Sequence, residues 1–166
     1  MQRAHTFWKI LAFAFACAIS QAAVADWKYY QAKGYGFSML IPEGTTMKEK
    51  ELGGGWGELW ADYEGVKLHG LAKKGAKESD ADIEKFAVKT IGIPASEWKK
   101  VDSGLGERGF ERHRTFEAVR GDKLYFGAYG VGKKGGNYLL YMETTVSDYD
   151  EHKADYRKWY DSIRLD

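Results

Sequence analysis

The chain has 166 residues, with 25 basic and 24 acidic side chains and a formal net charge of +1 at pH 7. These charges are interspersed without a long block of one sign, which argues against a nucleic-acid partner. A hydrophobic content of 44% permits one domain with an apolar core, and the single cysteine, Cys17, excludes an intramolecular disulfide.

The first 25 residues have the pattern of a secretory signal. Arg3 and Lys9 form a basic head, about ten apolar residues follow over 10–19, and the AVA at 23–25 suits signal peptidase. A helix that spans a bilayer needs roughly twenty residues. We therefore expect a cleaved signal peptide at 1–25, no stable membrane span after cleavage, and a single globular domain at 26–166 that is periplasmic or secreted. An uncleaved N-terminal anchor is the alternative.

Period-two alternation predicts three strands early in this domain. The first covers 35–41, where apolar side chains of the sequence FSMLI fall at every second position. The second and third cover 57–63 and 66–72. The two-residue turn between them predicts a tight antiparallel hairpin.

A helix is predicted after Ser79. This serine is a suitable N-cap, and Asp82 three residues later gives an acidic variant of the capping box. Apolar side chains over 83–91 then recur at helical spacing, and Gly92 and Pro94 end the pattern.

Three further strands are predicted at 110–119, 123–131 and 138–146, joined by glycine-containing turns. A final helix is predicted after Ser147, with one apolar and aromatic stripe formed by Tyr149, Tyr156, Tyr160 and Ile163. This element order predicts an α+β fold in which an antiparallel sheet of about six strands is flanked by helices.

Two strings have the spelling G-x-G-x-x-G, which holds phosphates in dinucleotide-binding proteins: GLGERG at 104–109 and GVGKKG at 130–135. The motif works only where it follows a strand and opens a helix, because the helix N-terminus binds the phosphate. Both strings here lead into strand-like sequence. We predict that they are turns, with no nucleotide and no other cofactor.

One group of residues has the side-chain types of a nucleophilic site. Glu111, His113 and Thr115 alternate and would share one face of a strand, which offers an acid, a base and a hydroxyl to a small hydrolase. The same pattern is typical of a solvated strand face, so we expect no catalysis and keep the hydrolase as the alternative. The histidines lack the spacing of a metal-binding motif, and no metal site is predicted.

Arg112 and Arg114 lie on one side of this strand. Their guanidinium groups suit a carboxylate or phosphate ligand held by paired hydrogen bonds. The alternative, which we favour, is ion pairing with acidic residues across the sheet.

Aromatic residues make up 15% of the chain. Five of them lie on or beside predicted strands: Trp56, Trp60, Tyr125, Tyr129 and Tyr141. If they are exposed, they form a platform for a partner protein, or a carbohydrate or lipid site centred on the two tryptophans. If a helix covers them, they form a second core layer, which is the arrangement that we favour.

The stretches YGFSMLIPEG at 35–44 and YLLYMETTVSDYDEHKADYRKWYDSIRL at 138–165, together with the element order, resemble the Mog1/PsbP-like superfamily. This group includes PsbP, Mog1 and exported bacterial proteins of the DcrB type. The resemblance implies an α/β/α sandwich around an antiparallel sheet, and a binding or accessory role. We therefore expect an exported binding module whose partner is an unidentified envelope protein.

Overall fold

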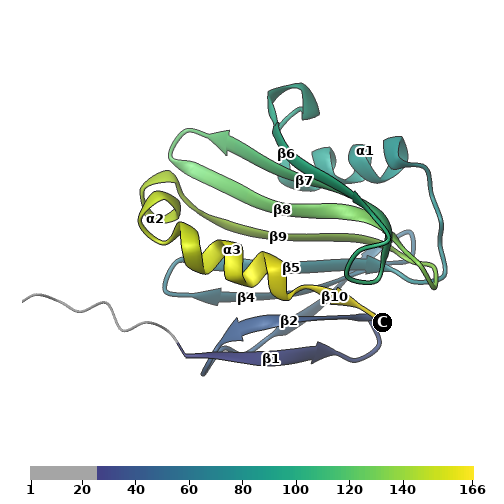
Figure 1. The fold of residues 1–166 in the computed structure, drawn as a ribbon, viewed down its shortest axis with the longest axis horizontal. Coiled ribbons are helices and arrows are strands. Elements are labelled where there is room, and N and C mark those ends of the chain that lie inside the picture. Colours follow the sequence, from purple (N-terminus) through teal and green to yellow (C-terminus); the bar gives the residue numbers. More distant parts are fainter. Residues whose placement is uncertain (1–25) are drawn as a thin grey trace, which may run out of the picture.

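The computed structural model describes residues 26–166, and the predicted signal peptide lies outside the described residues. Two antiparallel sheets form this part of the chain (Figure 1). The larger sheet has seven strands in the spatial order β3 (Lys48–Gly53), β4 (Trp56–Tyr63), β5 (Val66–Lys73), β9 (Asn137–Thr145), β8 (Lys123–Gly132), β7 (Phe110–Arg120) and β6 (Lys99–Leu105). The smaller sheet has three, in the order β1 (Trp27–Ala32), β2 (Phe37–Pro42) and β10 (Arg164–Leu165).

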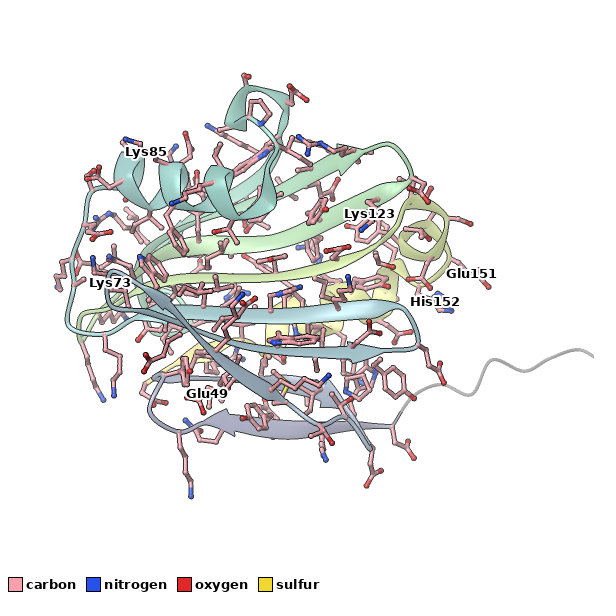
Figure 2. The ribbon with its side chains drawn as sticks, turned by 180° about the vertical axis from the view of Figure 1, so that it is seen from behind. Glu49, Lys73, Lys85, Lys123, Glu151 and His152 are labelled. Atoms are coloured by element: carbon pink, nitrogen blue, oxygen red, sulfur yellow. The ribbon has the colours of Figure 1, made fainter. Side chains whose placement is uncertain are left out.

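Helices cover both faces of the larger sheet (Figures 1 and 2). The helix α1 (Asp80–Ile91) packs on one face, which we call the α1 face. The helices α2 (Val146–Glu151) and α3 (Lys153–Ser162) pack with the smaller sheet on the opposite face, which we call the α3 face. Within residues 26–166, no helix is long and apolar enough to cross a membrane.

Each face has its own core, because successive side chains of a strand point to opposite sides of a sheet. On the α3 face, fully buried side chains of β2 and α3 pack on the strands, among them Phe37, Met39, Ile41 and Trp159. On the α1 face, the buried stripe of α1 packs on side chains of the central strands: Leu71, Phe116, Tyr129, Val131 and Leu139.

The ends of α1 follow the predicted signals. Ser79 Oγ accepts a hydrogen bond from Asp82 N at 3.2 Å, which satisfies one of the free N–H groups of the first turn. Gly92 has a φ of 79°, a left-handed conformation that suits glycine, and its N–H donates to Val88 O at 2.8 Å. The predicted helix is confirmed with these bounds.

The two sheets together have ten strands, whereas six strands in one sheet were predicted, and the predicted strand 35–41 is β2 of the smaller sheet. The four additional strands carry little sequence signal: β1, β3, β6 and β10. The strand β3 is exposed at every residue and β6 is mostly exposed, so neither has the buried face that produces alternation.

The C-terminal helix also differs from its prediction. Thr145, and not Ser147, caps it, because Thr145 Oγ1 accepts a hydrogen bond from Asp148 N at 3.1 Å. The chain then bends at His152, where φ is −112° and ψ is 25°, and the predicted single helix becomes α2 and α3.

Both glycine strings are turns. The string at 130–135 ends β8 and leads directly into β9, and the string at 104–109 ends β6 and leads into β7. Neither opens a helix, so neither has the strand, glycine loop and helix that a dinucleotide phosphate requires.

Candidate functional site

On the α1 face, the helix covers two of the five aromatic residues that the sequence singles out. Tyr129 is 2% exposed under α1 and donates a hydrogen bond to Glu84 of that helix. Trp56 is 7% exposed, and its ring stacks on Phe86 with centroids 3.8 Å apart. Both side chains are parts of the core. Trp56 and Trp60 therefore do not form a shared exposed platform for a carbohydrate or lipid.

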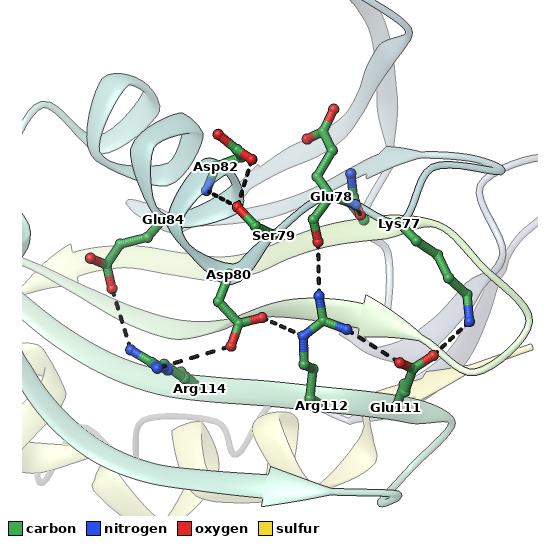
Figure 3. A network of polar contacts seen from close by, with 10 residues as sticks. Lys77, Glu78, Ser79, Asp80, Asp82, Glu84, Glu111, Arg112 and Arg114 are labelled. Atoms are coloured by element: carbon green, nitrogen blue, oxygen red, sulfur yellow. Dashed lines mark hydrogen bonds and ion pairs between the residues drawn. The ribbon is translucent and has the colours of Figure 1, made fainter.

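Both arginines that were considered as anion-binding residues already interact with α1 and with the segment that precedes it (Figure 3). Arg112 pairs with Asp80 and donates to Glu78 O at 2.8 Å. Arg114 lies 3.8 Å from a Glu84 oxygen and 3.9 Å from an Asp80 oxygen. The favoured interpretation, ion pairing, is thus the observed one. The partners come from α1 instead of a neighbouring strand, so the arginines fasten the helix to the sheet.

The predicted Glu111, His113 and Thr115 group does not assemble. Because β7 has a bulge between Phe110 and Arg112, the Glu111 side chain does not share a strand face with His113 and Thr115. Glu111 pairs with Lys77 at 2.6 Å, and this hydrogen bond lowers its pKa. His113 and Thr115 are instead buried on the α3 face. The shared strand face that the hydrolase alternative needs is absent.

The environment of His113 also prevents its ring from acting as a base. Its Nε2 lies 3.1 Å from Arg108 Nη2, and a guanidinium can only donate, so Nε2 is the acceptor and the ring is neutral. Burial and the charge of Arg108 lower the pKa of His113. Arg108 also donates to Tyr160 Oη at 2.5 Å, and that oxygen lies 2.5 Å from Thr115 Oγ1. These four side chains form a structural polar cluster.

Beside α1, the same sheet face carries no helix (Figure 2). There Trp60 of β4, His69 of β5 and Tyr141 of β9 are direct cross-strand neighbours, and we call these three residues the aromatic row. The His69 ring is parallel to that of Tyr141, with centroids 4.4 Å apart. Tyr125 of β8 extends the row at 6.3 Å from Tyr141.

Trp60 is the side chain of the row that is available for contact. It is half-buried and belongs to neither core cluster, whereas Tyr141 is 5% exposed. The ammonium group of Lys48 lies 4.5 Å from the centre of the Trp60 ring, which is a cation–π contact. Tyr125 is likewise half-buried. The row is therefore buried at β9 and opens toward β4 and β8.

Charged groups of both signs surround the row. His69 Nδ1 donates to Glu58 Oε1 at 2.7 Å, and Glu143 pairs with Lys123 at 2.6 Å and Lys67 at 3.6 Å. Burial opposes ionisation of Glu143, but the two lysines outweigh it and lower the pKa of this carboxyl. Burial raises the pKa of Tyr141, and its hydroxyl stays protonated at neutral pH.

Metal coordination has no candidate here. Residues 26–166 contain no group of three or more histidine, cysteine, aspartate or glutamate side chains that could hold a metal ion. The aromatic row with its charged surroundings has the chemistry of a contact surface, because aromatic side chains supply area and the surrounding charges supply orientation.

No protein-family model matches this sequence, and no curated protein sequence matches it. Among solved structures, the chain is similar to the solution structure of cyanobacterial PsbP (CyanoP) from Synechocystis sp. PCC 6803. The superposition has a TM-score of 0.60 at 14% identity and covers 88% of this chain and 96% of that one. The fold is PsbP-like. The resemblance predicted from the sequence is thereby confirmed at the level of fold.

Sequence reasoning missed Arg108, Tyr35 and Glu49 as residues with specific contacts. Arg108 lies in a turn at a φ of 51°, and its contacts to Tyr160 join residues 52 positions apart. Tyr35, in the β1–β2 turn of the smaller sheet, donates to Glu49 of β3 at 2.7 Å. The one local signal was the alternating KEKE of 48–51, which places both glutamates on one side of an extended strand.

Proposed function

We propose that this protein is an exported accessory protein of the cell envelope, and that it binds another protein through Trp60 and Tyr125 at the open ends of the aromatic row. The observation that supports this proposal best is the position of Trp60. Its large aromatic side chain lies outside both cores, whereas Trp56 on the same strand is covered by α1. Tryptophan and tyrosine are enriched at the energetic centres of protein interfaces.

The charges around the row favour a protein partner over a lipid surface. Lys48, Lys67 and Lys123 alternate there with Glu58 and Glu143. A mixed rim around an aromatic centre is typical of protein interfaces, whereas attachment to anionic lipids favours an excess of lysine and arginine.

Export rests on the sequence pattern of 1–25. We expect the full chain, produced in a bacterial host, to be recovered from the periplasm with Asp26 as its first residue. Intact-mass spectrometry of the recovered protein measures this directly. Recovery of uncleaved protein in the membrane fraction would instead support the N-terminal anchor.

Binding is tested by affinity capture from envelope extracts with residues 26–166 as bait. We expect a specific protein partner, and a loss of at least tenfold in its affinity with Trp60→Ala or Tyr125→Ala, because each change removes contact area from the row. Tyr29→Ala is the matched control, since Tyr29 is 67% exposed on β1 of the smaller sheet. Equal loss with Tyr29→Ala would contradict the proposed surface. Recovery of no partner, together with turnover in a hydrolase screen, would overturn the proposed function.

A further inference from the structure

A cavity of about 440 Å³ lies where the two sheets meet. Three segments form it: the β1–β2 turn, the β3–β4 hairpin and the end of β5. Its volume is within the range of pockets that bind small molecules. Its lining combines aromatic, glycine and charged residues: Lys33, Tyr35, Glu49, Glu51, Trp56 and Lys74, with Gly34, Gly53, Gly55, Gly57 and Ala72 between them.

Small residues leave this space open. Gly57 and Ala72 are direct partners across β4 and β5, so two minimal side chains lie opposite one another. Tyr35 packs over Gly57, where an added Cβ would come within 2.9 Å of the tyrosine ring. Gly53 and Gly55 bring only backbone to the cavity. A side chain larger than glycine at position 57 would therefore displace the Tyr35 ring that forms one wall of the cavity.

The charged groups come to the cavity from different segments. Glu49 and Glu51 project from the same side of β3, and Tyr35 Oη donates to Glu49 Oε1 at 2.7 Å. Lys33 comes from the β1–β2 turn and Lys74 from the turn that follows β5. Burial and the bond to Glu49 raise the pKa of Tyr35, so its hydroxyl remains a donor that holds the carboxylate in place.

These four charged side chains are exposed and form no ion pair among residues 26–166. Lys73, next to Lys74, pairs with Glu78 at 2.7 Å, and Lys77 pairs with Glu111 at 2.6 Å. The cavity is thus lined by charges of both signs, Lys33, Lys74, Glu49 and Glu51, which form no ion pair within the described chain, and the one side-chain hydrogen bond among them is that of Glu49 with Tyr35.

We propose that this cavity binds a small zwitterion, an amino acid or a dipeptide, whose carboxylate meets Lys33 and Lys74 and whose ammonium group meets Glu49 and Glu51. Charge-assisted hydrogen bonds of this kind are stronger than neutral ones. A purely anionic ligand meets repulsion from the glutamates, and a purely cationic ligand meets repulsion from the lysines. A neutral ligand would cover all four charges without satisfying them. The cavity is separate from the aromatic row, so the test of this proposal does not depend on whether the proposed function is correct.

The test is a titration of residues 26–166 with alanyl-alanine, followed by two-dimensional NMR of backbone amides and by calorimetry. We expect saturable binding with amide shifts at Gly53, Gly55 and Gly57. N-acetyl-alanyl-alanine lacks the ammonium group and alanyl-alanine amide lacks the carboxylate, and each should bind at least tenfold more weakly. Equal binding of all three peptides, or no saturable binding of the free dipeptide at millimolar concentration, would overturn the proposal.

Charge-neutral variants locate the site. Glu49→Gln keeps an acceptor for Tyr35 while removing the charge, and it should weaken dipeptide binding at least tenfold, as should Lys74→Gln. Glu151→Gln and Lys85→Gln are matched controls on α2 and α1, away from Glu49 (Figure 2), and they should bind as the unchanged protein does. Weakening by Lys74→Gln alone would indicate an anion site and contradict the zwitterion.

Discussion

At His113, the chain buries an imidazole next to a guanidinium, and both features oppose protonation of the ring. Its Nε2 accepts from Arg108, and its Nδ1 is buried without a hydrogen-bond partner in residues 26–166. Glu107 and Asp102 favour the charged ring, but burial and Arg108 outweigh them, and the pKa of His113 is lowered. The histidine that sequence reasoning offered as a catalytic base is therefore a buried neutral acceptor.

This lowered pKa predicts a pH dependence of stability. As pH falls below about 6.5, the unfolded chain protonates its histidine before the folded protein does. The free energy of unfolding is therefore fully retained above that pH and decreases as pH falls through the folded pKa. Urea unfolding between pH 5 and 8 should show this slope, and His113→Gln, which still accepts from Arg108, should reduce it. Identical slopes in the two proteins would contradict the assignment.

At the scale of elements, α1 is stabilised by its N-terminal cap and is held to the sheet by its apolar stripe and its ion pairs with Arg112 and Arg114. Ser79 makes two contacts there: Oγ accepts from Asp82 N at 3.2 Å and lies 2.6 Å from Asp82 Oδ2. We expect Ser79→Ala to lower the free energy of unfolding by about 1 kcal/mol, because a first-turn N–H loses its acceptor. Ser96→Ala, at an exposed serine after α1, should change it by less than about 0.5 kcal/mol. Equal effects in urea unfolding would show that the cap is not the cause.

Elements with a buried face were predictable, and edge elements were not. The strands β4 and β7 and the helix α1 bury apolar side chains at a regular period, which is visible in the sequence. The strands β8 and β9 are buried on both faces and were predicted as extended segments between glycine-containing turns. The strand β3, with the sequence KEKELG, is charged on both faces and is ordered by its pairing with β4. Its pairing partner lies outside the local window that a periodicity analysis reads.

The candidate site was only partly predictable for a related reason. Sequence alternation placed Tyr129 and Tyr141 on one sheet face, but the extent of coverage by α1 depends on where the helix lies across the strands. This placement separates Trp56, which stacks on Phe86, from Trp60, which does not. The bulge at Glu111 is another such case, because it reverses a side chain within 110–112, a stretch that itself contains no glycine or proline.

Gly70 allows a close approach of the two sheets. Gly70 of β5 lies under the ring of Phe37 of β2, and a Cβ at Gly70 would clash with that ring. We expect Gly70→Ala to cost about 1–3 kcal/mol of unfolding free energy through overpacking. Phe37→Leu should relieve part of this cost, so the double variant should be less destabilised than the sum of the single variants. Strict additivity in urea unfolding would mean that the two residues are not coupled.

At the scale of the whole molecule, the smaller sheet joins both ends of the described chain. The strand β2 pairs with β1 on one side and with the C-terminal β10 on the other, and its buried side chains enter the α3-face core. Leu165 of β10 is 7% exposed, and its N–H donates to Arg108 O at 2.8 Å. The C-terminus thus connects the smaller sheet to the turn that carries the buried polar cluster.

This connection predicts that residues 26–166 unfold in one step. Near-ultraviolet and far-ultraviolet circular dichroism should give coincident transitions, and amides of β1 and β2 should exchange hydrogen with the same dependence on denaturant as those of β8. Removal of residues 164–166 should destabilise the whole domain by about 2 kcal/mol or more, because it uncovers the core around Leu165 and frees the Arg108 turn. Arg164→Ala, at an exposed position, is the matched control and should have little effect. If the shortened chain lost protection only in β1 and β2, the smaller sheet would be a separate unit, and its packing on the α3 face would not be part of the cooperative fold.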